Sequence, residues 1–252
     1  MKICIPSKNR ERAAMTTLDL LTEIPKEDKL LFIEPQDLDL YSNLKDEVTL
    51  VLLDKNDRGL SYSRNFQIKH CFQEHSYDKI ITLDDNMQEF CIMENNKAKK
   101  LPNSEIPELF ERLEGISNRT ETALLTLGFR PSVWYAESDF KYNTRVWAFF
   151  LFDRERLGNL NFDPNILLFE DYDMVANIIT SGRKTGTYYK YAFYKKMGKS
   201  KGGDQFVKNH AISKMMCGYL QKKWGKDNIR VFYNKKHGIF EPQFLWSKLE
   251  RV

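Results

Sequence analysis

Short apolar runs recur along the first third of the chain, and longer polar or helix-prone segments separate them. The runs are Ile3–Ile5, Leu30–Ile33, Val48–Leu53 and Ile80–Leu83. Runs of this length that are bounded by turn residues predict buried β-strands. Because strands alternate here with crossover segments, the pattern predicts an α/β fold with a mostly parallel sheet and right-handed connections.

Helical spacing of apolar residues predicts helices between and after these strands. We expect helices over Glu11–Leu21, from the glycine turn at Gly59 to about His70, over Met174–Thr180, and over about Phe206–Trp224. Residues 94–118 are polar and helix-prone, and Ala123–Leu127 and Val146–Phe152 are predicted to be further strands.

Polar side chains follow the predicted strand ends. The run Ile80–Leu83 stops at Asp84, Asp85 and Asn86. Oxygen-bearing side chains at the end of a strand point into the crevice where open α/β sheets bind ligands, and hard oxygen ligands suit Mg²⁺ or Mn²⁺. A polar turn without a ligand is the alternative interpretation.

A second apolar triplet, Leu167–Phe169, leads into Glu170, Asp171 and Asp173. These acids precede a predicted helix, where negative charge is favoured by the helix dipole. They are either a functional carboxylate group or a simple helix cap. Near the start of the chain, the polar loop Ser7–Arg10 lies before a predicted helix, which is a natural position for binding an anion.

Charge is divided unevenly along the chain. Residues 181–240 contain 15 Lys or Arg and two acids, which gives them a formal net charge of +13. The whole chain has a net charge of +4, so the other 192 residues sum to −9. This division indicates an anionic partner for the C-terminal quarter, and a solvated basic face is the alternative.

Composition places few further limits on the protein. Hydrophobic residues make up 42% of the 252 residues, enough for the core of one large α/β domain or two small ones. The four cysteines are widely spaced, as is typical of reduced thiols in a cytosolic protein. No apolar run reaches 18 residues and no apolar signal segment opens the chain, so we expect neither a membrane span nor a secretory leader.

The order of these motifs resembles that of GT-A-fold nucleotide-sugar glycosyltransferases. The segments that carry the resemblance are Ile5–Arg10, Gly59–Asn65, Leu83–Asn86 and Phe169–Asp173, and together they span about the first seventy per cent of the chain. They are similar to the opening strand and donor loop, the Gly-x-x-x-Ala-Arg-Asn segment, the DxD strand end and the Glu-Asp motif. Two departures are visible, since Ser63 replaces the alanine and Asn86 replaces the last aspartate.

A narrower resemblance is to the TET-associated glycosyltransferases of tailed phages. It implies transfer of a sugar from a UDP-sugar to the hydroxyl of a 5-hydroxymethylated pyrimidine, such as 5-hydroxymethylcytosine, in double-stranded phage DNA. The implied location is the host-cell cytoplasm. The implied donor-binding residues are Pro6, Ser7, Asn9, Arg10, Glu34, Arg64, Asn65 and Asp84.

The resemblance also implies metal and catalytic roles. Mn²⁺ or Mg²⁺ would bind at Asp84, Asp85 and Asn86, and either Asp84 or Asp85 would be the principal ligand. His237 or His210 is the expected candidate for the third metal ligand. Asp171 is the expected catalytic base, and Glu170 is the second choice.

Residues 1–182 are expected to form the catalytic core, and residues 183–252 a basic, aromatic-rich part that binds the acceptor. The expected DNA contacts are Tyr188, Lys195, Lys196, Lys199 and Lys201. A saccharide or lipid-linked acceptor and a non-catalytic nucleic-acid-binding module are the alternatives. The sugar, the anomeric outcome, base flipping or groove access, and the oligomeric state stay open.

Overall fold

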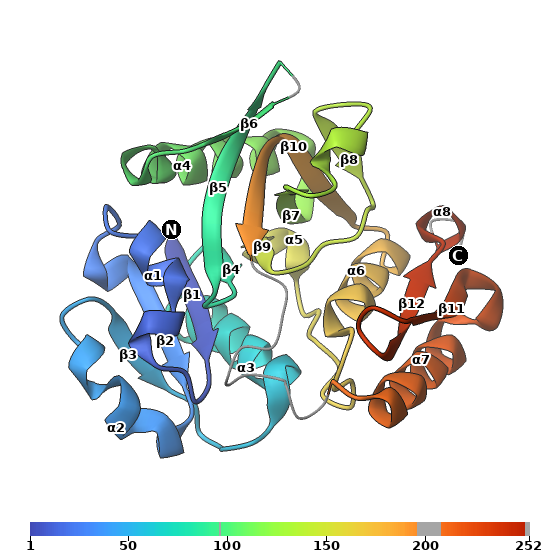
Figure 1. Cartoon of the computed structure of the whole chain (residues 1–252), viewed down its shortest axis with the longest axis horizontal. Coiled ribbons are helices and arrows are strands. Elements are labelled where there is room, and N and C mark those ends of the chain that lie inside the picture. Colours follow the sequence, from blue (N-terminus) through green and yellow to red (C-terminus); the bar gives the residue numbers. More distant parts are fainter. Residues whose placement is uncertain (96, 196–207, 250–252) are drawn as a thin grey trace.

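The computed structural model describes residues 1–95, 97–195 and 208–249 (Figure 1). The strands are β1 (Lys2–Ser7), β2 (Lys29–Ile33), β3 (Thr49–Leu52), β4 (Lys79–Leu83), β5 (Met87–Glu94), β6 (Lys97–Lys100), β7 (Thr122–Phe129), β8 (Phe140–Tyr142), β9 (Phe149–Asp153), β10 (Lys184–Lys195), β11 (Ile229–Asn234) and β12 (Ile239–Phe244). The helices are α1 (Thr16–Leu20), α2 (Leu38–Tyr41), α3 (Gly59–Ile68), α4 (Ile106–Thr120), α5 (Arg154–Leu157), α6 (Glu170–Thr180), α7 (His210–Trp224) and α8 (Trp246–Leu249).

One large sheet organises the molecule. Its strand order is β3-β2-β1-β4-β9-β7-β10-β5-β6, with β8 paired to β10. Strands β3, β2, β1 and β4 are parallel, whereas β9 is antiparallel to both β4 and β7. Leu83 at the end of β4 therefore pairs with Phe149 at the start of β9. The ends of β1 and β4 and the start of β9 meet at one edge of the sheet.

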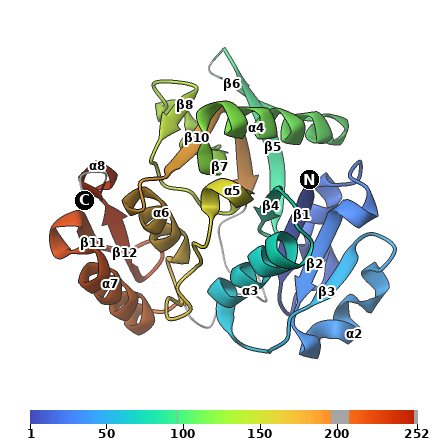
Figure 2. The ribbon, with the colours of Figure 1, turned by 180° about the vertical axis from the view of Figure 1, so that it is seen from behind.

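Two apolar cores lie on the two faces of this sheet, which Figures 1 and 2 show from opposite sides. One core includes Leu18 of α1, Tyr41 of α2 and Phe110 of α4. The other includes Ile68 of α3, Leu157 of α5 and Val175 of α6. Apolar side chains therefore alternate across both faces of the sheet, and the predicted α/β class is confirmed.

The C-terminal part packs on α6. Strands β11 and β12 form an antiparallel hairpin, and Leu220 of α7 joins Tyr172 of α6 in the second core. Asp173 of α6 is fully buried and accepts hydrogen bonds from Trp224 Nε1 at 2.8 Å and Lys223 Nζ at 2.9 Å. Asp173 therefore joins this part of the chain to the helix that follows the Glu-Asp motif.

Several predicted elements differ in detail from the structure. The strand that we expected to begin at Val146 begins at Phe149 in the structure. Ala148 has a φ of +60°, which is outside the strand region. The polar stretch after residue 94 first forms β6, a lysine-rich edge strand, and helix α4 begins only at Ile106. The expected helix over Glu11–Leu21 contains a short 3₁₀ turn followed by α1.

Within the described part of the chain, no helix has the length and apolar character needed to cross a membrane.

Candidate active site

Five segments bring charged side chains to the sheet edge where β1 and β4 end (Figure 1). They are the loop after β1, helix α3, the turn after β4, the start of α6 and the end of β10. We call this group the carboxylate–cation cluster, and its members are Asp84, Asp85, Glu170, Asp171, Arg10, Arg64 and Lys195. All seven were predicted site residues, although Lys195 was expected to contact the acceptor.

Asp85 holds the loop after β1 in place. Its Oδ2 accepts a hydrogen bond from Ser7 Oγ at 2.7 Å and lies 2.8 Å from Arg10 Nε. The hydroxyl of Tyr41 completes this network, because it lies 2.9 Å from Ser7 Oγ and accepts from the Arg10 backbone N–H at 3.0 Å. Burial raises the pKa of Asp85 to about 6, against the attraction of Arg10. Asp85 thus acts here as a buried anchor for the loop.

Asp84 is more open than Asp85 and faces cations. Its Oδ2 contacts Lys195 Nζ, and its Oδ1 lies 3.5 Å from Arg64 Nη2. Burial opposes ionisation of this carboxyl, but Lys195 and Arg64 outweigh it and lower its pKa. Thr17 fixes the backbone of the turn, since its Oγ1 donates to the Asp84 carbonyl at 2.5 Å and accepts from the N–H of Met87 at 2.9 Å. The carboxylate of Asp84 is therefore held ionised at a fixed position.

Arg64 links the end of β4 to the start of α6. It is 3% exposed, and its Nη1 donates to Glu170 Oε1 at 2.6 Å. Its guanidinium carbon lies 4.5 Å from the ring centre of Phe150 and 5.5 Å from that of Phe162. A planar guanidinium stacked on aromatic rings has few alternative positions. Arg64 therefore fixes Glu170 relative to Asp84.

Asp171 lies beside Glu170 in the first turn of α6. Its Oδ1 accepts a hydrogen bond from the Tyr172 backbone N–H at 3.0 Å. Burial and the negative charge of Glu170 raise the pKa of Asp171 to about 6, while Arg145 and Arg64 oppose the rise. A carboxyl group that titrates near 6 is ionised at neutral pH and basic enough to accept a proton.

Strained backbone surrounds the cluster. Asn9, Ala148 and Phe169 have φ angles of +46°, +60° and +70°. Non-glycine residues rarely adopt this region, and such residues gather at functional sites. Phe169 is bulky and immediately precedes Glu170, so its conformation sets the direction in which α6 begins.

A smaller polar group lies beyond the loop after β1. Glu34 is 5% exposed, and its carboxylate accepts from Lys8 Nζ at 3.1 Å and from Gln36 Nε2 at 2.6 Å. Pro6 is the next-to-last residue of β1, and the backbone N–H of Asn9 donates to Asp37 Oδ2 at 2.9 Å. These predicted donor residues therefore share one end of the sheet with the carboxylate–cation cluster.

Asn65 has both side-chain polar atoms engaged with the backbone. It donates to the carbonyl of Phe162 and accepts from the N–H of Phe162, both at 2.8 Å. The side chain thus pins the segment that leads toward α6, and it positions the cluster from a distance.

The residues predicted to bind the acceptor are only partly described. Tyr188 lies in the middle of β10, and its half-buried ring packs on the core. Lys196, Lys199 and Lys201 lie outside the described residues. Lys195 Nζ lies 5.3 Å from the ring centre of Trp147 as well as against Asp84.

His210 and His237 lie in the C-terminal part. The His210 ring packs at 5.0 Å from that of Phe240, and exposed His237 follows β11. Within the described residues, neither belongs to a group of three possible metal-ligating side chains.

Sequence reasoning missed four residues that shape the site: Thr17, Tyr41, Arg145 and Trp147. Arg145 is exposed, and its guanidinium carbon lies 4.6 Å from the ring centre of Tyr172, next to Asp171. None of the four belongs to a local motif, so only the folded chain reveals them.

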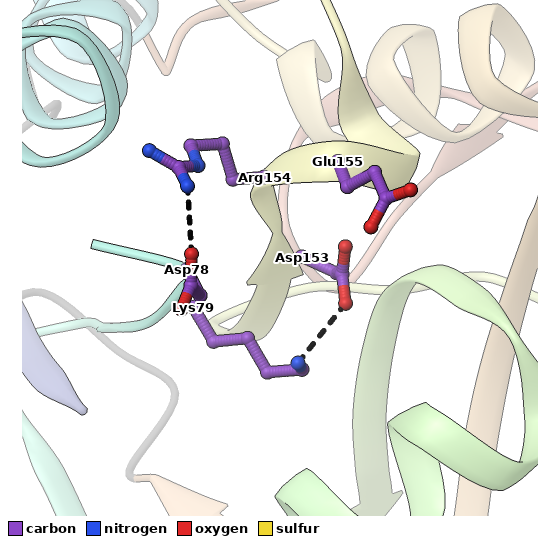
Figure 3. A pocket seen from close by; sticks show the side chains of 5 residues that line it. All are labelled: Asp78, Lys79, Asp153, Arg154 and Glu155. Carbon is purple, nitrogen blue, oxygen red and sulfur yellow. Dashed lines mark hydrogen bonds and ion pairs between the residues drawn. The ribbon is translucent and has the colours of Figure 1, made fainter. Parts of the chain in front are cut away.

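A cavity of about 580 Å³ lies at the opposite edge of the sheet (Figure 3). It is lined by Asp78, Lys79, Asp153, Arg154 and Glu155. Lys79 begins β4, whereas Asp84 follows its end, so the cavity is separated from the cluster by the length of the strand. Its charges largely neutralise each other, with Lys79 Nζ 3.1 Å from Asp153 and Arg154 Nη2 2.7 Å from Asp78.

Comparison with known proteins bears on the family and the fold of the chain. A family model described as TET-Associated Glycosyltransferase matches residues 1–203. No curated protein matches the chain at a significant level.

Several solved structures share the fold. A Pyrobaculum calidifontis mannosyltransferase, PcManGT, solved with GDP-Man and Mn²⁺, is 13% identical, with a TM-score of 0.58 over 90% of this chain and 63% of that one. Staphylococcus aureus TarS 1-349 in complex with UDP is 11% identical, with a TM-score of 0.50 over 88% of this chain and 66% of that one. GalNAc-T7 with UDP, GalNAc and Mn²⁺ is 11% identical, with a TM-score of 0.50 over 90% and 49%. The chain thus spans about two thirds or less of these proteins, and they establish the GT-A fold that the motifs predicted.

Proposed function

The chain belongs to the TET-associated glycosyltransferase family, and we propose from this premise that it transfers a sugar from a UDP-sugar to a hydroxymethylated pyrimidine in DNA. The hydroxyl of 5-hydroxymethylcytosine is the proposed acceptor, and Mn²⁺ or Mg²⁺ is the proposed cofactor. The observation that carries the proposal is the bridge made by Arg64 between Asp84 and Glu170. It fixes the proposed cation ligand Asp84 relative to the start of α6, where the proposed base Asp171 lies beside Glu170.

The donor is proposed to bind where β1 and β4 end. The network of Ser7, Arg10 and Asp85 keeps the first loop beside Asp84. Glu34 and Asn9 lie further along the same edge, where the nucleoside would be held. This arrangement follows the rule that open α/β sheets bind ligands beyond the carboxyl ends of their strands.

The residues present fit a hard divalent cation. Asp84 is ionised, and its carboxylate contacts the ammonium group of Lys195. A divalent cation would take the place of that ammonium group on the carboxylate. We assign Asp84 as the principal ligand and part-exposed Asn86 as a second oxygen ligand, with Asp85 supporting the turn from its buried position. A bound divalent cation would neutralise the charge that develops on the diphosphate leaving group.

Asp171 is the proposed general base. As the acceptor oxygen attacks the anomeric carbon, the hydroxyl proton passes to Asp171, the bond from the sugar to the diphosphate breaks, and UDP leaves. The raised pKa of Asp171 suits this transfer. Arg64 and Glu170 position the start of α6, so Glu170 supports the base without taking the proton.

The acceptor is proposed to bind along the C-terminal part. The hairpin of β11 and β12 exposes the rings of Phe232 and Tyr233, each 46% exposed, and the basic residues Lys235 and Lys236 follow at its turn. Aromatic rings stack on bases, and lysines neutralise phosphates. The charge of +13 over residues 181–240 supports an anionic acceptor.

Intact-mass analysis of DNA tests the proposal. Hydroxymethylcytosine DNA and matched unmodified DNA are each incubated with the protein, a divalent cation and a panel of UDP-sugars. We expect a mass gain of one sugar residue per hydroxymethylated base and no gain on unmodified DNA. Turnover of the UDP-sugar without a mass gain on either DNA would contradict the DNA acceptor and favour a saccharide acceptor.

A charge-reversal pair tests the acceptor surface. Lys235→Glu with Lys236→Glu should weaken DNA binding and flatten its dependence on salt, since each phosphate contact contributes a slope of about 0.9 in log K against log salt. The matched control reverses Lys99 and Lys100, two exposed lysines of β6. Equal loss in both variants would indicate a general charge effect and contradict the assigned surface.

A further inference from the structure

Two histidines and a glutamate meet where α3 ends and the chain returns toward β4. Among the described residues, one group of three His, Cys, Asp or Glu side chains has all its possible metal-ligating atoms within 4.8 Å of one another. Its members are His70, Glu74 and His75. His70 is partly buried, whereas Glu74 and His75 are exposed to solvent.

A π-helix makes this arrangement possible. Residues Lys69–Glu74 continue α3 as a π-helix, and the N–H of His75 donates to the carbonyl of His70 at 3.1 Å. In an α-helix, five residues cover about 1.4 turns, so two histidines at this spacing would point to different sides. The five-residue hydrogen bond brings the chain back over its starting residue, and the two imidazole rings lie 4.4 Å apart. Single π-turns inside helices often mark functional sites.

Aromatic neighbours hold both imidazole rings in place. The ring of His70 stacks on Phe66 at 6.4 Å and meets the edge of Phe32 at 5.7 Å. The ring of His75 stacks on Tyr77 at 5.8 Å, with only 10° between the planes. Such packing orients ligands before a metal ion arrives, which is the role that outer-shell groups have in metal sites.

From this geometry we propose that His70, Glu74 and His75 bind one transition-metal ion of the Zn²⁺ class. His70 Nδ1 lies 3.1 Å from Glu74 Oε2. Two ligand atoms of a tetrahedral zinc site, each about 2.0–2.1 Å from the metal, lie about 3.3 Å apart. Three protein ligands and one water complete a tetrahedral shell, and imidazole favours Zn²⁺, Cu²⁺ or Ni²⁺ over Mg²⁺ and Mn²⁺.

The ammonium group of Lys69 lies beside the proposed metal site, where it pairs with Glu74. Its Nζ lies 3.3 Å from Glu74 Oε1, the oxygen that does not contact His70. Glu74 can therefore keep Lys69 on one oxygen and offer the other to the metal.

This site is separate from the carboxylate–cation cluster. The two groups share no residue. The proposal therefore does not depend on the proposed function. A metal at this position would join the end of α3 to the segment entering β4. It would stabilise the folded chain by an amount that rises with the logarithm of its free concentration.

Metal titration of the full chain without an affinity tag tests the proposal. Isothermal titration with ZnCl₂ is compared between the wild type, His70→Ala with His75→Ala, and the matched control His210→Ala with His237→Ala. These four are all the histidines of the chain. We expect the first variant to lose one saturable zinc equivalent, the control to keep it, and zinc to raise the Tm of the wild type and control only.

Two further measurements keep the result interpretable if the double variant folds poorly. Glu74→Gln changes an exposed side chain and should weaken zinc binding by at least about tenfold. Co²⁺ should give a visible absorption band in the wild type, and this band should be lost in Glu74→Gln and in His75→Ala. Equal zinc binding in the wild type and the His70/His75 variant, or loss in the His210/His237 control, would overturn the assignment.

Discussion

Replacing Asp171 by asparagine is expected to stabilise the fold while it slows the reaction. Burial and the charge of Glu170 raise the pKa of Asp171 from its ordinary 3.8 to about 6, although Arg145 and Arg64 oppose the rise. A carboxyl group with a higher pKa in the folded state binds its proton more tightly there. Its contribution to stability is therefore fully present below about pH 4 and is lost as pH rises toward about 6.

The size of this effect follows from the same pKa values. At about 1.4 kcal/mol per unit, the rise from 3.8 to about 6 corresponds to a cost of about 3 kcal/mol at pH 7.5. Asp171 is not completely enclosed, and solvent screening reduces the expected gain for Asp171→Asn to about 1–2 kcal/mol. The gain should shrink as pH falls from 6 to 4, because the wild-type carboxyl is then neutral in the folded chain.

The neighbouring Glu170 provides a control with the opposite sign. Its Oε1 lies 2.6 Å from Nη1 of Arg64, whose side chain is 3% exposed. Glu170→Gln leaves that buried guanidinium without its closest carboxylate, which should cost about 3–5 kcal/mol of unfolding free energy. Two adjacent acids in the same helical turn should thus give stability changes in opposite directions.

Denaturant unfolding at pH 7.5 and pH 4.5 measures the stability change, and single-turnover transfer to hydroxymethylcytosine DNA between pH 5 and 8 measures catalysis. A base acts only when ionised, so the wild-type rate should rise with pH and level off above about 6. Asp171→Asn should lower this rate by about 10² or more, with nucleotide affinity little changed. A destabilised Asp171→Asn, or one with the wild-type rate, would refute this account of α6.

Three other changes test the rest of the site. Asp84→Asn should abolish the Mn²⁺-dependent part of UDP binding in calorimetry, and full activity of the wild type in excess EDTA would contradict a metal there. Asp85→Asn removes the carboxylate shared by Ser7 and Arg10, so the loop after β1 should lose its anchor and donor affinity should fall. Asn65→Ala loses two hydrogen bonds to the Phe162 backbone, so a cost of about 1–3 kcal/mol is expected. Unchanged donor affinity in Asp85→Asn, or an unchanged Tm in Asn65→Ala, would show that these contacts do not have the assigned roles.

The family and the GT-A fold could be recognised from local patterns in the sequence, and both are confirmed. A strand that is buried on both faces must be apolar throughout, so β1, β2 and β4 are visible as uninterrupted runs. Their polar ends follow directly in the chain, which is why Asp84 could be singled out after β4. Asp171 could be singled out because it follows the apolar triplet Leu167–Phe169. The particular roles of these residues stay predictions.

Strands β6 and β10 were harder to predict. Strand β10 mixes tyrosines with lysines, and β6 is Lys-Ala-Lys-Lys, so neither shows an apolar run. Strand β10 pairs with β5 and β7, which are distant in the sequence, whereas β6 pairs with its sequence neighbour β5. Propensity is a weak guide where such pairing decides the structure.

The composition of the carboxylate–cation cluster depends on contacts between distant parts of the chain. Lys195 and Asp84 are separated by 111 positions, and Arg64 and Glu170 by 106. The sequence does not show which side chain a charged residue pairs with. Lys195 lies in a basic stretch and was therefore predicted to contact a phosphate, but β10 places it beside Asp84 at the end of β4. The sequence determined which strands are buried and which polar residues end them, because both are local properties. Only the tertiary structure decided which charges neutralise each other, because that depends on strand order and on the direction in which α6 begins.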